Sequence, residues 1–159
     1  MPSNNKFAKI LFTSISIGFV LFVFSNSMYP GPESSKKSQF ALNVINMLNV
    51  HMGISIPITE HIVRKLGHFT EYFILGNLLT LTVRMYVKRP IKYIFIELFS
   101  LLAVPVLDEF LQTFIQGRSG NVGDVILDFM GGLVGMLVCM LLIYRIDAVK
   151  THVKNGQSA

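Results

Sequence analysis

The chain has 159 residues, of which 52% are hydrophobic and 14% are charged, and its formal net charge is +5. A soluble domain carries roughly 25% charged residues, so this chain has too few polar groups to cover a water-soluble globule, and its apolar content excludes a disordered protein. The basic residues occur in small groups between apolar runs, which excludes a nucleic-acid-binding face. We therefore expect a membrane protein whose main partner is the lipid bilayer, with no nucleic-acid partner.

Four apolar stretches are close to the roughly 20 residues that a helix needs to cross the hydrocarbon core. None of them alternates apolar and polar residues as membrane β-strands do, and a helix satisfies its own backbone hydrogen bonds in lipid. The predicted spans are residues 7–24, 67–87, 91–107 and 122–144. This pattern predicts one all-α membrane domain over residues 1–159, built as a four-helix transmembrane bundle.

The distribution of basic residues predicts how this bundle is oriented across the membrane. Lys and Arg concentrate in cytoplasmic connections, and nine of the fourteen lie on one side of the layout, namely Lys6, Lys9, Arg84, Lys88, Arg89, Lys92, Arg145, Lys150 and Lys154. We expect a multi-pass protein of the cell membrane with both termini in the cytoplasm and external connections at 25–66 and 108–121. The alternative for the first span is a cleaved signal peptide, which would leave the N-terminus outside.

The first external connection is long and contains a repeating apolar pattern. Near-helical spacing predicts an amphipathic helix on the membrane surface or over the bundle, carried by Phe40, Ala41, Val44, Ile45, Leu48 and Val50. Because this segment has little basic charge, we favour a cover for the bundle over a binder of anionic lipids. Pro57 ends any regular structure, and Thr59-Glu60 is predicted to start the next helix.

Ionisable side chains gather at the predicted external ends of three spans. Charges within a span are costly, so they usually face a protein interior or water. The first cluster is Lys65, His68, Glu71 and Tyr72; the second is Asp108, Glu109 and Gln112; the third is Arg118, Asn121, Asp124 and Asp128. Helical spacing places members of a cluster on one face, and the topology brings all three clusters to one depth. We therefore predict an outward-facing polar pocket.

A structural role is the competing interpretation of this pocket. Lys65 could snorkel to the headgroups, and Arg118 could pair with Asp108 or Glu109 for stability alone. Glu71 and Asp128 are harder to explain in this way because they lie a turn or more inside their spans. A carboxylate at that depth needs a partner, a shifted pKa or a water-filled cavity.

Glu97 stands apart from these clusters, in the third span. It precedes Asp108 by eleven residues, almost three whole turns, so the two share a helix face. Glu97 either carries the polar face inward or forms an ion pair with Lys92 or Arg84, and we favour the ion pair.

Small residues mark one face of the fourth span. Gly131 and Gly135 form a G-x-x-x-G pair, which lets two helices approach closely. We expect this pair to pack the fourth span within the bundle.

No linear sequence motif in this chain identifies a particular reaction. His68 with a nearby carboxylate could act as a general base, and carboxylates with His68 could hold a divalent metal. However, His61 and His68 are seven residues apart and no H-E-x-x-H pattern is present. The single cysteine, Cys139, lies in an apolar run. We therefore predict no metal site and no cofactor, and favour a protein that is not an enzyme.

The polar clusters resemble the VanZ-like family. The matching pieces are residues 64–72 (RKLGHFTEY), residues 108–112 (DEFLQ), Gly117-Arg118, Asp124 and residues 131–135. The resemblance covers about residues 60–142. Two positions depart from the family pattern: Phe129 stands where a small polar residue is expected, and Asp128 stands where many relatives carry Asn.

The resemblance implies a small polytopic protein of the bacterial envelope, linked to antibiotic resistance of the teicoplanin type. It leaves two hypotheses for the pocket. In the first, the protein is not a catalyst, and the pocket binds an amphiphilic ligand such as a lipid-linked wall precursor or a lipoglycopeptide. In the second, the protein is an integral-membrane enzyme in which His68 or Glu71 moves protons and Arg118 holds an anionic group of a lipid-linked substrate.

Overall fold

The computed structural model describes residues 5–53, 57–87 and 90–156, and these residues form helices joined by short connections, with no strand among them. The prediction of an all-α fold is confirmed. In chain order the helices are α1 (Lys6–Ser27), α2 (Gly31–His51), α3 (Glu60–Tyr86), the 3-10 turn η1 (Pro90–Tyr93), α4 (Ile94–Gln112) and α5 (Val122–Gly156).

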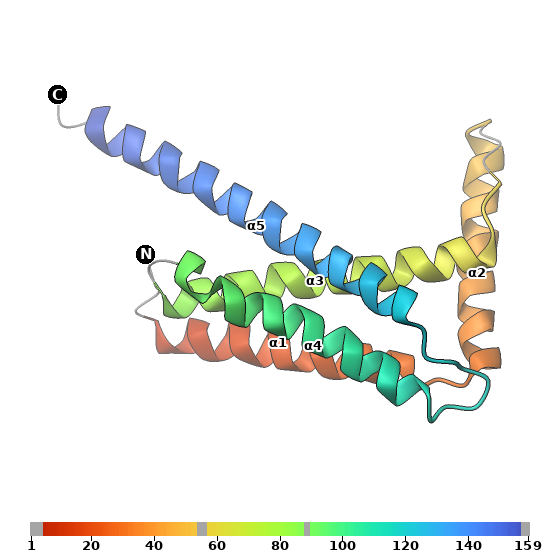
Figure 1. The fold of residues 1–159 in the computed structure, drawn as a ribbon. Helices are drawn as coiled ribbons and strands as arrows, with labels where there is room; N and C mark the ends of the chain where they lie inside the picture. Colours follow the sequence, from red (N-terminus) through yellow and green to blue (C-terminus); the bar gives the residue numbers. More distant parts are fainter. Residues whose placement is uncertain (1–4, 54–56, 88–89, 157–159) are drawn as a thin grey trace.

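The long helices form a bundle whose two ends differ (Figure 1). Helices α1, α3 and α4 contact one another, and α5 packs on α3 and α4 before it diverges toward its C-terminus. Helix α2 packs on α3 and runs across the end of the bundle that lies opposite both chain termini. The polar residues of the three predicted clusters belong to the α2 end, and the connection between α3 and α4 belongs to the other.

Within the part of the chain that the structure describes, two helices are long and apolar enough to cross a membrane: α1 over Lys6–Ser27 and α5 over Val122–Lys150. The described parts of α3 and α4 are long but carry more polar and charged residues. Large apolar side chains point outward from α1 and α4, as a lipid-facing surface requires; Phe7 and Phe99 are 70% and 72% exposed. The structure supports a membrane protein, whereas the four-span layout stays a prediction.

The helix boundaries differ from the predicted spans in ways that have local causes. The predicted third span begins at residue 91, but Pro90–Tyr93 forms a 3-10 turn and α4 begins at Ile94. Helix α5 continues well past residue 144, to Gly156. The predicted start of α3 is confirmed, because Thr59 is its N-cap and the Thr59 side chain accepts a hydrogen bond from the Ile62 backbone N–H at 3.3 Å.

Helices α3 and α5 approach so closely that their backbones touch. A Cβ atom added to Gly131 would overlap the Phe69 carbonyl, and one added to Gly135 would overlap the Phe73 carbonyl. The two glycines are four residues apart and so are the two carbonyls, so the contact repeats along one face of each helix. Close packing here fixes the register of α3 against α5, and with it the relative positions of the polar side chains one or two turns away.

The favoured prediction for Glu97, an ion pair, is wrong, and the alternative of an inward-turned side chain is confirmed. Arg84 instead donates to Asp147 on the long extension of α5, with Nη2 and Oδ2 2.5 Å apart. Glu97 is 2% exposed and accepts a hydrogen bond from the Thr80 hydroxyl on α3. The side chain therefore turns into the bundle and away from the basic end. Of the basic residues predicted at that end, Lys88 and Arg89 lie outside the described residues, as does the side chain of Lys154.

The first connection contains the predicted helix, which is α2. Its first half packs on the bundle through Ser38 and Leu42, which are 9% exposed each. Phe40, Leu48 and Val50 are 72%, 55% and 81% exposed, so α2 covers the bundle only in part. An apolar surface of this kind suits a helix at the membrane interface.

Candidate functional site

The candidate site lies where α2 crosses the end of the bundle. It is built from the beginnings of α2, α3 and α5, the end of α4 and the connection 113–121. That connection is tied to α2 by a hydrogen bond of 3.2 Å from the Gly31 backbone N–H to the Gln116 carbonyl. Gly117 has a φ of +75°, a backbone conformation that residues with a side chain rarely adopt. A Cβ atom on Gly31 would overlap the backbone carbonyl of Gly117. The two glycines let the loop close over the site.

Two adjoining cavities open at this end. The first has a volume of about 310 Å³ and is lined by Gly31, Ser34, His61, Arg64, Lys65, His68, Gln112, Gly117, Arg118, Ser119, Asn121, Asp124 and Leu127. The second has a volume of about 220 Å³ and is lined by Asn26, Ser34, Lys37, Ser38, Ala41, Val63, Arg64, Gly67, His68, Glu71 and Arg118. Both cavities share Ser34, Arg64, His68 and Arg118, so these side chains stand at the boundary between them.

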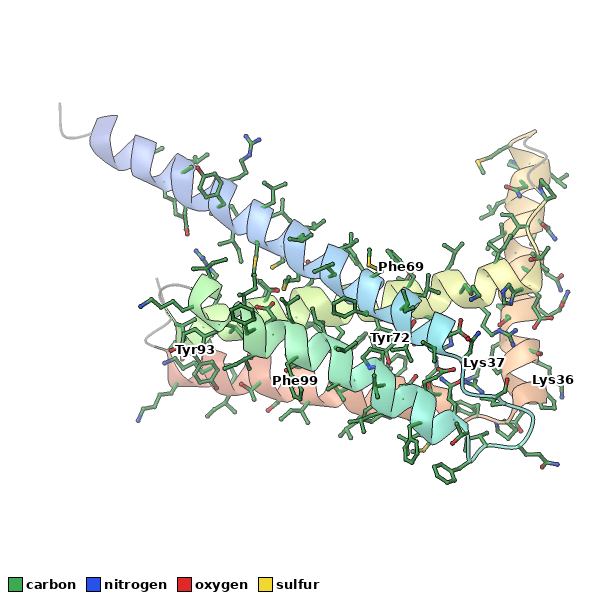
Figure 2. The ribbon with its side chains drawn as sticks, in the orientation of Figure 1. Lys36, Lys37, Phe69, Tyr72, Tyr93 and Phe99 are labelled. Carbon is green, nitrogen blue, oxygen red and sulfur yellow. The ribbon has the colours of Figure 1, made fainter. Side chains whose placement is uncertain are left out.

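The predicted site residues separate into two layers. Six of them line the first cavity, namely Lys65, His68, Gln112, Arg118, Asn121 and Asp124, and Glu71 lines the second. Tyr72, Asp108, Glu109 and Asp128 line neither cavity and are buried, at 0%, 0%, 6% and 0% exposed. Figure 2 shows the buried Tyr72 within the bundle. The site is thus an accessible polar rim above a buried layer of carboxyl groups.

Among the described residues, the rim contains one close ion pair. Lys65 on α3 donates to Asp124 on α5 with Nζ and Oδ1 2.7 Å apart, and each side chain is about one third exposed, at 35% and 32%. This pair joins the second turn of α3 to the first turn of α5. The glycine contacts hold the same two helices together further along. Lys65 therefore neutralises Asp124, and does not neutralise the buried carboxyl groups.

Glu71 has partners that the sequence did not suggest. Asn26, near the end of α1, donates a hydrogen bond from its side-chain Nδ2 to Glu71 Oε1 at 2.6 Å. Lys37 on α2 donates to the side-chain oxygen Oδ1 of Asn26 at 3.3 Å. The predicted cluster residue Glu71 is thereby tied to α1 and α2 as well as to its own helix. Asn26 and its neighbour Ser27 offered little signal, because a short polar run at the end of a span is common.

Asp108 is held by two hydrogen bonds to one oxygen. Ser27 donates to Oδ2 at 2.7 Å and Gln112 donates to the same oxygen at 3.1 Å. The other oxygen, Oδ1, is buried and makes no hydrogen bond of normal geometry in the described part of the chain, although the buried Tyr72 hydroxyl lies near enough to Asp108 to interact with it. Ser27 of α1 thus helps to orient the Asp108 carboxyl group of the predicted α4 cluster, while Oδ1 of that group accepts no such hydrogen bond from the described residues.

His68 and Asp128 face each other across α3 and α5. Their Nδ1 and Oδ2 atoms are 3.8 Å apart, which is too long for a hydrogen bond. Neither Asp128 oxygen nor His68 Nδ1 has a hydrogen-bond partner among the described residues. Burial of Asp128 is therefore unfavourable, because no hydrogen bond from those residues offsets the loss of its hydration.

Arg118 makes no ion pair within the described residues, so the pairing with Asp108 or Glu109 that the competing structural interpretation allowed is not observed. Partial burial lowers the pKa of the Arg118 guanidinium, and the nearby carboxyl group of Asp108 acts in the opposite direction. Glu109 instead accepts a hydrogen bond from the Asn121 backbone N–H at 2.7 Å, which anchors the loop that carries Arg118. Arg64, which was not among the predicted site residues, also lines both cavities and makes no ion pair with another described residue.

The fold and this site define a helical membrane protein with a polar cavity at one end of the bundle. The sequence model of the VanZ/LLP1 family matches residues 12–143. The chain therefore belongs to the VanZ/LLP1 family, as its motifs predicted. No curated protein and no solved structure matches the chain.

Proposed function

We propose that this chain is a multi-pass protein of the bacterial cell membrane whose polar cavities face outward and hold the headgroup of an amphiphilic envelope molecule. The favoured ligand is a lipid-linked wall precursor. By holding it, the protein contributes to resistance to glycopeptides of the teicoplanin type. Both termini lie in the cytoplasm, and α1, α3, α4 and α5 span the bilayer.

One observation carries this proposal. Arg64 and Arg118 both line the two cavities, and neither makes an ion pair with another described residue. Guanidinium groups bind phosphate and carboxylate through paired hydrogen bonds. Two such groups at one opening are suited to an anionic headgroup of a lipid.

The remaining lining suits an amphiphile with both polar and apolar parts. Glu71 and Asp124 supply acceptors for ammonium or amide groups of the ligand, and Ala41, Val63 and Leu127 supply apolar surface. Ligand sites commonly combine an apolar lining with a few well-placed polar groups. This combination favours a lipid-linked ligand over a free inorganic ion.

A resistance assay combined with a binding assay tests the proposal. We expect Arg118→Gln and Arg64→Gln to lower resistance at normal membrane abundance, and to weaken binding of a polyprenyl phosphate to the purified protein. Loss of a hydrogen bond to a charged group costs about 1.5–3 kcal/mol, which corresponds to roughly a 10- to 150-fold loss of affinity. The matched control is Arg145→Gln, at an exposed position near the opposite end.

Two results would argue against this function. Resistance that falls only in proportion to protein abundance would favour a structural network, and unchanged binding in both cavity variants would remove the arginines from the site. Titration with teicoplanin in place of the polyprenyl phosphate distinguishes the antibiotic from the precursor as the ligand.

An enzyme acting on a lipid-linked substrate is the second candidate. The observation that favours it is His68, which lines both cavities while its Nδ1 faces Asp128 at 3.8 Å. A histidine beside a carboxylate is a common general base. Turnover of a polyprenyl phosphate or pyrophosphate by the purified protein, lost in His68→Gln, would favour this candidate over simple binding.

A further inference from the structure

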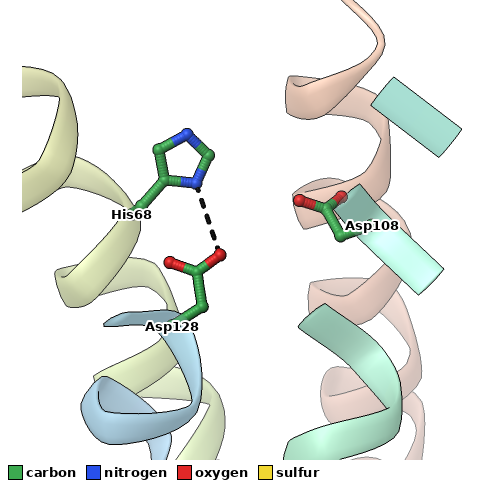
Figure 3. A group of neighbouring side chains, drawn as sticks. All are labelled: His68, Asp108 and Asp128. Carbon is green, nitrogen blue, oxygen red and sulfur yellow. Dashed lines mark ion pairs between the residues drawn. The ribbon is translucent and has the colours of Figure 1, made fainter. Parts of the chain in front are cut away.

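Three side chains from three different helices converge beneath the cavities. His68 of α3, Asp108 of α4 and Asp128 of α5 each present one nitrogen or oxygen atom, and these three atoms all lie within 4.8 Å of one another. Figure 3 shows the His68 ring turned toward the Asp128 carboxylate. The three residues come from three separate stretches of sequence, so only the packing of the helices brings them together.

Four nitrogen and oxygen atoms of these three side chains are buried and have no hydrogen-bond partner among the described residues. His68 Nδ1, Asp108 Oδ1 and both oxygens of Asp128 are inaccessible and make no hydrogen bond there. The whole Asp128 side chain is 1% exposed. Buried polar atoms are nearly always hydrogen-bonded in folded proteins. Four unpartnered atoms in one group therefore indicate a bound species that contacts all three side chains.

We propose that His68, Asp108 and Asp128 bind a divalent metal ion of the Zn²⁺ or Mn²⁺ class. One imidazole nitrogen and two carboxylate oxygens form a mixed donor set that suits such ions. Metal–ligand bonds to these atoms are about 2.0–2.2 Å long, so neighbouring ligand atoms of one tetrahedral ion lie roughly 3.3–3.6 Å apart. Because the three atoms now lie within 4.8 Å of one another, side-chain rotations must bring them closer by up to about 1.5 Å.

The surroundings of Asp108 prepare it for this role. Ser27 and Gln112 both donate to Oδ2, which fixes the carboxylate and leaves Oδ1 for the ion. Hydrogen bonds of this kind to the outer atom of a ligand group are the usual support of metal sites. The nearby cation Lys65 does not compete, because it is paired with Asp124 at 2.7 Å.

Three protein ligands leave a coordination position for water or for an incoming group. His68 lines both cavities, so this position is reached from the side where the headgroup is proposed to bind. The metal site does not rest on that proposal, because it follows from the buried atoms alone. It replaces the expectation of no metal, which depended on the absence of a linear motif.

Metal binding by the full-length protein, purified in detergent and stripped with chelator, tests this site. We expect one equivalent of Zn²⁺ or Mn²⁺ to bind by calorimetric titration with no amphiphile present. Removal of an outer-shell partner weakens metal sites by about 10- to 100-fold, so His68→Ala and Asp128→Asn, which each remove a ligand, should weaken binding by more than about 100-fold.

Matched controls separate this site from adventitious binding. His51→Ala removes an exposed histidine outside both cavities, and Glu97→Gln removes a buried carboxyl group outside the cluster; both should bind metal as the unmodified protein does. If Asp128→Asn does not fold, the absorption spectrum of bound Co²⁺ gives a second test, because His68→Ala should alter it. Absence of binding to the unmodified protein, or equal binding by the triple variant His68→Ala, Asp108→Asn, Asp128→Asn, would overturn the proposal. Neither result would affect anion binding by the arginines.

Discussion

Replacing Gly135 with alanine tests the backbone contact between α3 and α5. A Cβ at Gly135 would overlap the carbonyl group of Phe73, which is backbone and cannot move aside as a flexible side chain would. The two helices must separate or shift, and overpacking of this kind costs about 1–3 kcal/mol. Alanine also raises helix propensity by about 1 kcal/mol relative to glycine, which offsets part of that cost.

The matched control is Gly18→Ala in α1, where no atom lies within 4 Å of the added Cβ. This variant gains the same helix propensity of about 1 kcal/mol without overpacking. The two variants should therefore differ in unfolding free energy by about 1–3 kcal/mol, with Gly135→Ala the less stable. Reversible unfolding in detergent micelles, followed by circular dichroism, measures the difference. Equal stability of the two variants would show that α3 and α5 do not pack backbone against backbone.

Three further substitutions test other contacts by the same unfolding assay. A double-mutant cycle on Lys65 and Asp124 should give a coupling of at most about 1 kcal/mol that falls with added salt, because the pair is partly exposed; a larger, salt-independent coupling would contradict this placement. Thr80→Val removes the hydroxyl that donates to the buried Glu97 and should cost about 1–3 kcal/mol, whereas Thr80→Ser should cost less; equal losses would refute the hydrogen bond. Leu75 is 0% exposed, so Leu75→Ala should cost about 2–5 kcal/mol, and a loss well below this range would place it outside the core.

The helices and the end of the bundle that carries the site could be predicted from the sequence. Apolar stretches of membrane length predicted the long helices, and the cap at Thr59 followed from local chemistry. Alternating helix direction then required the polar residues near Lys65, Asp108 and Asp124 to meet at one end, since consecutive antiparallel helices reverse their ends.

Side-chain partners could not be predicted in the same way. Glu97 had basic residues nearby in sequence, but its partner is Thr80 on another helix, and only the packing of α3 on α4 decides this. Asn26 and Ser27 of α1 hold Glu71 and Asp108, although the polar clusters alone suggested a site built from three helices. Hydropathy reports which segments are buried and does not report which side chains meet.

Labelling of single cysteines in intact cells tests most directly the claim that the polar end of the bundle faces outward. In a Cys139→Ala background, which removes the one native thiol, a cysteine is placed at Ser119 beside the first cavity or at Lys92 near the opposite end. With a membrane-impermeant maleimide, we expect Ser119→Cys to react in intact cells and Lys92→Cys to react only after the membrane is opened. The reverse pattern would place the cavity in the cytoplasm and contradict a role in handling envelope molecules from outside.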